Sequence, residues 1–347
     1  MIVHQFVPNL EPGAVGTHTV LARDQLRAAG HASDIFTAEV HADSKNVGAR
    51  LVREYRGDAD VIVYQMAIGS VVADAVLGRP EPLVVNHHNL TPLRYITGWQ
   101  PVAAHGVVWG RAQLRELASQ ARLGVADSSY NEQDLIDAGL TRTSVVPPLL
   151  DLGTLEAAPA SAGRPGPTTW LFVGRLAPNK AQHDVIKALA AYRRFHDASA
   201  RLVLVGGGTD EPYAATLRKF VKSLDLDDAV TFTGGVSDDE RTAYYARADV
   251  FVVTSEHEGF CVPLVEAMFH RVPIVAFSAA AVPETLGDAG LLLETKEPCT
   301  VAAAVHRMLT DDAVLSHVVT AGAARAPRFD VTYTGPAFVA AVTSAAR

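Results

Sequence analysis

The sequence predicts an α/β protein made of two Rossmann-like domains, each with a doubly wound parallel sheet, that face each other across a cleft. Three observations favour this class. The chain has 347 residues, enough for two domains of about 150 residues each. Short runs rich in Val, Ile and Leu alternate with helix-like stretches, and they are apolar throughout, as parallel strands covered by helices on both faces are. An Ala-, Pro-, Gly- and Ser-rich stretch separates two such series.

Each half of the chain is expected to contribute six strands. In the first half they are Ile2–Val7, Ile35–Val40, Val61–Gln65, Leu83–His88, Gly124–Asp127 and Ser144–Val146. In the second half they are Trp170–Gly174, Leu202–Gly206, Val230–Gly234, Val250–Thr254, Ile274–Phe277 and Leu291–Leu293. The expected domains are 1–152 and 170–330, joined by a linker at 153–169 that contains EAAPASAGRPGPTT. Residues 331–347 are expected to form a helix that could cross back to the first domain.

Composition and charge narrow the function classes. With 48% apolar and 20% charged residues the chain is typical of a globular protein, and its formal charge of −8 argues against a nucleic-acid-binding surface. Cys261 and Cys299 are too few for a disulfide framework, so a reducing cytoplasm is expected. Met1 is followed by IVHQFV without a basic leader, so no signal peptide is expected. No apolar run approaches the roughly 20 residues of a membrane-spanning helix.

The chemistry is expected in the turns that follow strands, because ligands of open α/β sheets bind beyond the carboxyl ends of the strands. The densest such turn is SEHEGFCVP, residues 255–263. Its proline suits the first turn of a helix, so the backbone amides of Gly259, Phe260, Cys261 and Val262 would lie unpaired at a helix start. Such a start attracts a phosphate through its free donors and its dipole.

Two carboxylates flank this anion site. Glu258 lies on the turn, and Glu266 lies eight positions later on the expected helix. They would repel an anion unless each bound hydroxyls on either side of it. A nucleotide sugar has this layout, with its diphosphate between sugar hydroxyls and ribose hydroxyls. The alternative is an acidic turn beside an ordinary helix, with Glu266 solvated.

Two cations follow the first strand of the second half. Arg175 comes directly after Trp170–Gly174, and Lys180 lies five residues later at the start of a helix. Together they could converge on one diphosphate, Arg as a planar fork and Lys as a point charge. They would then neutralise the leaving group where many enzymes use a metal ion, so no metal is expected as a cofactor. Read alone, both would be surface charges.

Histidines and glycines mark two turns in the first half. Neighbouring side chains on a strand point to opposite faces, so at most one of His87 and His88 in VVNHHNLT would face the cleft. A structural histidine is the alternative. The turn PGAVGTH, which contains Gly13 and Gly16, could approach a phosphate or the acceptor, although a turn that needs positive φ explains its glycines equally well.

Between Trp170 and Gly290 the chain resembles family 4 of the retaining glycosyltransferases, which have the two-Rossmann GT-B architecture. The segments FVGRLAPNK, LVLVGGG, VTFTGGVSDDE, ADVFVVTSEHEGFCVPLVEAM and PIVAF follow one another in the order and spacing of that family. The combination is specific, whereas each piece alone is not. In the first half HHNLTP, the region Trp99–Leu117 and ADSSYNEQDLIDAG are similar but less distinctive.

The resemblance implies a role for each candidate residue of the second half. Glu258 would contact donor-sugar hydroxyls, and Glu266 the ribose hydroxyls. Arg175 and Lys180 would bind the diphosphate, helped by backbone at Gly259, Phe260, Cys261 and Val262. Val236, in the turn after Val230–Gly234, would lie near the base. Together these roles describe a site for a nucleotide sugar.

In the first half the resemblance favours His88, which is followed by Asn89, over His87 for the sugar side of the cleft. Amides near Gly16 would lie by the donor phosphates or the acceptor. Three departures from the family pattern are visible. Cys261 stands where glycine is usual, His270–Arg271 replaces a small-residue pair, and Gly-Ala-Val-Gly replaces a double glycine in the first turn.

The expected reaction is front-face substitution with retention, in which a phosphate oxygen of the leaving diphosphate takes the acceptor proton. A UDP-sugar is favoured as donor over a GDP-sugar, and the acceptor is a hydroxyl of a glycan, lipid-linked or small molecule. The acidic run Asp238-Asp239-Glu240 could suggest a metal but is better interpreted as helix capping.

Three other functions stay open. An epimerase or a glycoside phosphorylase could use the same architecture, and a catalytically silent protein could bind nucleotide sugars without turnover. Peripheral membrane contact is conceivable through Ile96–Leu117, which carries Trp99 and Trp109. Its basic residues are few, so a packed helix or a wall of the acceptor site is the favoured interpretation.

Overall fold

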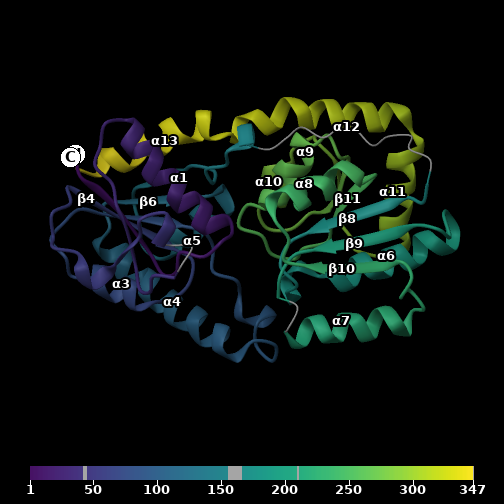
Figure 1. Ribbon diagram of the computed structural model, residues 1–347, viewed down its shortest axis with the longest axis horizontal. Helices are drawn as coiled ribbons and strands as arrows, with labels where there is room; N and C mark the ends of the chain where they lie inside the picture. The colour runs from purple at the N-terminus through teal and green to yellow at the C-terminus, as the bar shows by residue number, and fades with distance from the viewer. Residues whose placement is uncertain (42–44, 155–165, 209–210, 347) are drawn as a thin grey trace. The chain divides into compact units, whose positions relative to one another are not determined.

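The computed structural model describes residues 1–41, 45–154, 166–208 and 211–346. The chain divides into two compact units (Figure 1). Unit 1 consists of residues 1–97, 101–151 and 328–347, and unit 2 consists of residues 98–100 and 152–327. Most of the expected linker, residues 155–165, lies outside the described residues. No helix in the described part of the chain is long and apolar enough to cross a membrane.

Unit 1 contains a parallel sheet of seven strands in the order β3-β2-β1-β4-β5-β6-β7. The strands are β1 (Val3–Val7), β2 (Ile35–Thr37), β3 (Arg50–Leu51), β4 (Val61–Met66), β5 (Leu83–His87), β6 (Leu123–Ala126) and β7 (Thr143–Val145). Every neighbouring pair is parallel, so each connection must return over a face of the sheet.

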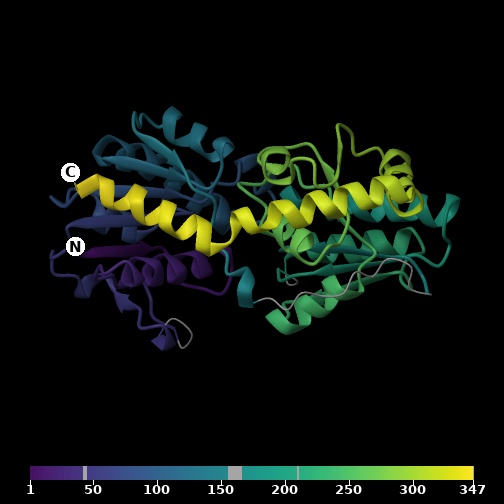
Figure 2. The same ribbon diagram turned by 90° about the horizontal axis from the view of Figure 1, so that it is seen from above.

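Helices cover both faces of this sheet. They are α1 (Ala14–Ala28), α3 (Val71–Val76), α4 (Pro101–Gln120), α5 (Ser129–Asp137) and α13 (Val331–Thr343), with short 3-10 turns η1 (Val52–Glu54), η2 (Leu93–Tyr95) and η6 (Ser344–Ala346). Successive strand residues enter different cores, because Val61 and Val63 pack with α1 and α13 whereas Ile62 and Tyr64 pack on the face of α3 and α4. Helix α13, the yellow helix nearest the C label in Figure 2, lies beside α1.

Unit 2 contains a parallel sheet of six strands in the order β10-β9-β8-β11-β12-β13. The strands are β8 (Thr169–Val173), β9 (Arg201–Val205), β10 (Val230–Gly234), β11 (Val250–Val253), β12 (Ile274–Phe277) and β13 (Leu291–Leu293). The order reverses between β8 and β11, which places the carboxyl ends of these two strands side by side. In a doubly wound sheet this switch point is where ligands bind.

The helices of unit 2 pack in two layers. They are α6 (Gln182–Phe195), α7 (Pro212–Ser223), α8 (Asp238–Arg247), α9 (Val262–Phe269), α10 (Val282–Leu286), α11 (Pro298–Thr310) and α12 (Asp312–Arg325), with 3-10 turns η3 (Leu152–Thr154), η4 (Pro178–Lys180) and η5 (Ala326–Phe329). Helix α6 packs with α7 and α11, while α9 packs with α10 and α12. Figure 1 shows α7 on one side of the sheet and α8, α9 and α12 on the other.

The expected strands agree closely with the observed ones. The strands at Val230–Gly234, Ile274–Phe277 and Leu291–Leu293 are confirmed to the residue, and the other nine are confirmed with shifts at their ends. The exception is β3, at Arg50–Leu51, which was not expected. It has two residues and exists because it pairs with the edge strand β2, so it carries too little apolar sequence to be recognised alone.

Candidate functional site

Two turns at the switch point of unit 2 are joined by hydrogen bonds. One contains η4 and leads into α6, and the other runs from β11 to α9. The Asn179 side-chain amide donates to the His257 carbonyl at 3.1 Å, and the Glu256 amide donates to the Asn179 carbonyl at 2.8 Å. The Thr254 hydroxyl donates to the Ala181 carbonyl at 2.9 Å. The two turns therefore form one rigid edge of the sheet.

This edge brings together two of the expected ligand-binding residues. Lys180 Nζ lies 2.6 Å from Glu258 Oε2, and the two side chains are 23% and 7% exposed. The Glu258 carbonyl also accepts from the Ala281 amide at 3.2 Å. The cation and the carboxylate, 78 positions apart in sequence, thus meet because β8 and β11 are neighbours.

Arg175 lies on the same edge, directly after β8. Its side chain is exposed and forms no ion pair or side-chain hydrogen bond with any residue that the structure describes, so its guanidinium can accept a ligand. The Gln182 side chain donates to the Arg175 carbonyl at 2.9 Å and so fixes the backbone of this turn. Gly206 packs so tightly here that a Cβ would lie 2.2 Å from the Gly174 carbonyl oxygen. The GGG segment after β9 was thus a signal of close packing that sequence analysis did not use.

The start of α9 has the form expected of an anion site. Cys261 precedes the helix, and Pro263 occupies its first turn. The Cys261 and Val262 amides donate no backbone hydrogen bond to a residue that the structure describes. The Thr285 hydroxyl donates to the Phe260 carbonyl at 2.6 Å and anchors the turn.

Cys261 departs from the family pattern in a way that the backbone explains. Its φ is 73°, in the left-handed region that glycine enters without strain. The side chain is buried, and burial raises the pKa of the thiol well above its ordinary value. Its thiol is therefore neutral at physiological pH, and the neighbouring Glu258 adds to the rise in its pKa.

Glu266, expected at the ribose, is held by two residues that sequence analysis missed. The Tyr245 hydroxyl donates to Glu266 Oε2 at 2.9 Å, and Arg241 Nε lies 3.3 Å from Glu266 Oε1. Burial raises the pKa of this carboxyl above its ordinary value, and Arg241 and Tyr245 offset that effect only in part. Both residues lie on α8, so the sequence does not show that they contact Glu266 of α9.

The unusual pair His270–Arg271 also contributes to this cluster. The His270 ring stacks on Tyr245 with 5.0 Å between centroids and 17° between planes. Burial lowers the pKa of His270 to about 4, so the ring is neutral. The departure from small residues thus places an aromatic ring against the tyrosine that holds Glu266.

A third missed residue is Lys296, which follows β13. Its ammonium lies 2.7 Å from Asp184 Oδ2, pairs closely with Glu256 and sits 5.4 Å from the centre of the Phe277 ring. Burial disfavours the charge, but hydrogen bonds to Asp184 and Glu256 outweigh that effect and raise the pKa of Lys296. This lysine therefore ties the β13 connection to the turn that carries Glu258.

In unit 1 the two neighbouring histidines point to opposite faces of the sheet. His87 is fully buried and its Nε2 lies 3.2 Å from Asp134 Oδ2 on α5. His88 Nδ1 lies 2.9 Å from Asp127 Oδ2, and its Nε2 lies 2.6 Å from the Gln65 side-chain amide. The His88 side chain is only 3% exposed. Sequence analysis missed Asp127, although it follows β6 at the carboxyl edge of the sheet.

Gly16 and Val236 lie in different units. Gly16 is buried in the first turn of α1, where a Cβ would lie 2.0 Å from the Glu11 carbonyl oxygen, so packing alone requires this glycine. Val236 lies between β10 and α8. The next residue, Ser237, forms a capping box with Glu240, which confirms the capping interpretation of the acidic run.

Lys180, Arg175, Glu258 and the start of α9 therefore share one edge of unit 2, whereas His88 belongs to unit 1.

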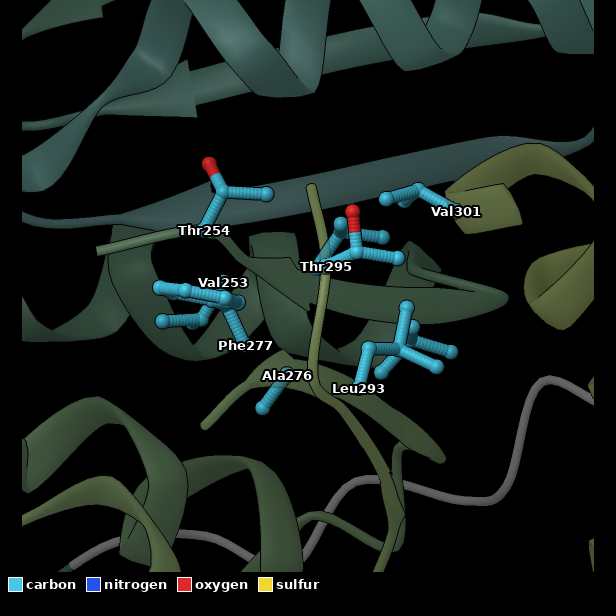
Figure 3. A pocket seen from close by; sticks show the side chains of 9 residues that line it. Val253, Thr254, Ala276, Phe277, Leu293, Thr295 and Val301 are labelled. Carbon is cyan, nitrogen blue, oxygen red and sulfur yellow. The ribbon is translucent and has the colours of Figure 1, made fainter. Parts of the chain in front are cut away.

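A small pocket lies beyond this edge, among Val253, Thr254, Ala276, Phe277, Leu293, Thr295 and Val301 (Figure 3). Its lining is mostly apolar, and it has no room for a water molecule. This pocket is a gap in side-chain packing and contains none of the expected site residues.

Comparisons with known proteins identify the family. The family described as "Glycosyl transferases group 1" matches residues 156–325. A GDP-mannose-dependent alpha-(1-6)-phosphatidylinositol monomannoside mannosyltransferase of Mycobacterium tuberculosis is 32% identical over 264 residues, 67% of this chain and 66% of that protein. A D-inositol 3-phosphate glycosyltransferase of Kineococcus radiotolerans is 31% identical over 276 residues, 72% of this chain and 62% of that protein.

The chain belongs to the glycosyl transferases group 1 family, as the sequence motifs predicted. The matched region spans 66% and 62% of the length of these two relatives. Among solved structures, Anabaena HepE in complex with UDP-glucose is similar with a TM-score of 0.80 and 20% identity, covering 99% of this chain and 100% of that one. This likeness confirms the predicted GT-B fold class of two Rossmann-like domains.

Proposed function

We propose that the protein is a glycosyltransferase that moves a sugar from a nucleotide diphosphate onto a hydroxyl acceptor, with retention and without a metal ion. One observation carries the proposal. Lys180, Glu258, the exposed Arg175 and the open start of α9 occupy one edge of the unit 2 sheet, at its switch point. Cations and unpaired amides suit a diphosphate, and a carboxylate suits sugar hydroxyls. Family membership supports the reaction class.

Each side chain has a definite task in this proposal. Arg175, Lys180 and the α9 amides bind the diphosphate and stabilise the charge that it gains on leaving. Glu258 accepts from hydroxyls of the transferred sugar. Glu266 accepts from the ribose hydroxyls, and its two contacts within the protein orient it for that purpose.

The reaction needs no strong base among these residues. The acceptor oxygen forms a bond to the anomeric carbon on the face from which the diphosphate departs, while the bond from that carbon to the phosphate oxygen breaks. The acceptor proton passes to the departing phosphate oxygen. A contact between His88 and the donor sugar stays a prediction.

The donor is the part of the proposal that the comparisons sharpen. The sequence favoured a UDP-sugar, but the mannosyltransferase that is 32% identical is named for GDP-mannose. We therefore place GDP-mannose first among the donors to be tested, with UDP-sugars second. A lipid-linked or cyclitol hydroxyl is the first acceptor class to test, because the two relatives are named for such acceptors.

A thermal-shift screen of nucleotide sugars, followed by product analysis, tests the proposal. A donor present at 100 times its Kd should stabilise the protein by about 2.7 kcal/mol. The product with acceptor should carry the anomeric configuration of the donor by NMR, at the same rate with and without EDTA. Inversion, or activity lost to EDTA and restored by Mn²⁺, would contradict it. Products formed from donor alone indicate epimerisation, and products formed with inorganic phosphate indicate phosphorolysis.

A further inference from the structure

We infer that a chain of hydrogen bonds in unit 1 fixes His88 as the neutral tautomer that carries its proton on Nδ1 and an acceptor lone pair on Nε2. The chain runs through His18, Asn86 and Gln65, all fully or almost fully buried. This inference rests on the proposed function only in giving His88 a role at a ligand. Its protonation state follows from the contacts alone.

The first link is a backbone amide. The Leu149 N–H donates to His18 Nδ1 at 3.0 Å, and an amide N–H can only donate, so Nδ1 carries no proton. His18 is fully buried, and burial lowers its pKa well below the ordinary value. The ring is therefore neutral, and its single proton is on Nε2.

The second link fixes the Asn86 amide. One terminal atom of Asn86 lies 2.7 Å from His18 Nε2. If that atom were Nδ2, two donors would face each other, so it is the oxygen Oδ1. Turning an amide about its terminal bond exchanges O and N without moving any other atom, and hydrogen-bond partners decide between the two orientations.

The third link fixes the Gln65 amide in the same way. The same Asn86 atom lies 2.8 Å from a terminal atom of Gln65, and two oxygens cannot share a hydrogen bond, so Gln65 presents Nε2. Its two protons serve two acceptors, Asn86 Oδ1 and His88 Nε2, the latter at 2.6 Å. The Gln65 oxygen then faces the Gln5 side chain at 2.7 Å, so the Gln5 amide must turn as well and donate to it through Nε2.

The last link is His88 itself. Because its Nε2 accepts from Gln65, its proton is on Nδ1 and is donated to Asp127 Oδ2 at 2.9 Å. The opposite amide orientation would put oxygens at both ring nitrogens and would require a doubly protonated His88. The series of hydrogen bonds that begins at the Leu149 amide therefore decides whether the His88 ring is neutral or charged.

Two titratable groups face the His88 ring. The charged group that faces it is the Asp127 carboxylate, and the titratable His18 ring lies edge-on with 4.7 Å between centroids. Phe338 of α13 covers the other side of His18 at 5.4 Å. Because Nε2 of His88 accepts, a ligand hydroxyl that replaces Gln65 there must donate its proton to Nε2. Gln65, Asn86 and His18 are therefore positioning residues, which decide that Nε2 accepts a hydrogen bond and does not donate one.

Two-bond ¹H–¹⁵N spectra of the full chain with ¹⁵N-labelled histidine test the inference, with His18→Gln and His88→Gln variants for assignment. At pH 7 His88 should show a protonated Nδ1 and an unprotonated Nε2, and His18 should show the reverse. A doubly protonated His88, or one with its proton on Nε2, would overturn the inference. The readout needs no turnover, so it is separate from the test of the transferase activity.

Substitutions of the hydrogen-bonded residues extend the test. In Gln65→Glu an acceptor replaces the donor at Nε2, so His88 should become doubly protonated at pH 7. In Asn86→Asp the contacts with His18 and Gln65 still involve an acceptor oxygen. The spectrum should therefore show His88 in the same tautomer as in the unsubstituted protein. Gln120→Glu is the matched control. The Gln120 side-chain carbonyl accepts from the Gly78 amide at 2.8 Å, and Gln120 is not part of the series of hydrogen bonds that ends at His88. An unchanged His88 in folded Gln65→Glu would contradict the inference.

Discussion

Lys180 Nζ lies 2.6 Å from Glu258 Oε2, so the cation expected at the diphosphate and the carboxylate expected at the sugar neutralise each other. Both are largely shielded from water, and a charge left alone in such a place is costly. The contact with Lys180 orients the Glu258 side chain before a ligand arrives. Under the proposed function, a diphosphate that binds Lys180 would meet a cation whose carboxylate partner is already placed for sugar hydroxyls.

Replacing Lys180 by Ala should lower kcat by roughly 10²–10³, as the loss of other donors to transition-state charge does. Arg175→Ala should have an effect of the same order, since its guanidinium is free for the diphosphate. Steady-state kinetics with saturating donor measures both. Lys219→Ala, which removes an exposed lysine on α7, is the control and should leave kcat unchanged. Near wild-type turnover in both site variants would defeat the assignment.

Replacing Arg241 by Leu should destabilise the protein in a pH-dependent way. Because the pKa of Glu266 is raised by burial, its contribution to stability is fully present at low pH and is lost as pH rises through the folded-state pKa. Without Arg241 the ionised carboxylate loses its cation, at a cost of about 1–3 kcal/mol. Urea unfolding at pH 4.5 and pH 7.5 should show the larger deficit at pH 7.5. Arg247→Leu, exposed at the end of the same helix, should change stability by less than about 0.5 kcal/mol at both.

Replacing Lys296 by Met should leave Asp184 and Glu256 without their shared cation. The lysine side chain is 17% exposed, so the free energy of unfolding should fall by roughly 3 kcal/mol, at the low end for a broken buried pair. The turn that carries Glu258 should also shift and raise the donor KM. Combining the substitution with Asp184→Asn should cost less than the sum of the two single changes, because the interaction between Lys296 and Asp184 is then lost only once. Strict additivity in denaturant unfolding would contradict this role.

Replacing Phe338 by Ala should test the attachment of α13 to the core of unit 1. The Phe338 side chain, on α13, is fully buried and its ring contacts the His18 ring. Truncation of such a side chain costs about 3–5 kcal/mol. The matched control is Tyr333→Ala on the same helix, since Tyr333 is 67% exposed. Thermal unfolding should separate the two variants by several degrees, and equal midpoints would show that α13 adds little to the unit.

The local sequence determined the strands, the helix starts and the chemistry of the turns. Ile274–Phe277 was recognisable because a short apolar run flanked by breakers has few other stable conformations, and Pro263 marked the start of α9. The same reasoning missed β3, since two residues form a strand only when a neighbouring strand lends them hydrogen bonds. Family motifs then supplied the expected roles of residues such as Lys180.

Only the tertiary structure decided which side chains meet. Lys180 and Glu258 are 78 positions apart, Lys296 and Glu256 are 40 apart, and His88 depends on Gln65, 23 positions before it. Backbone preference is a property of neighbouring residues, so the sequence displays it. Partners are a property of strand order and helix packing, which many weak contacts settle together across the whole unit. The protonation of His88 follows from those partners and not from its place in the chain.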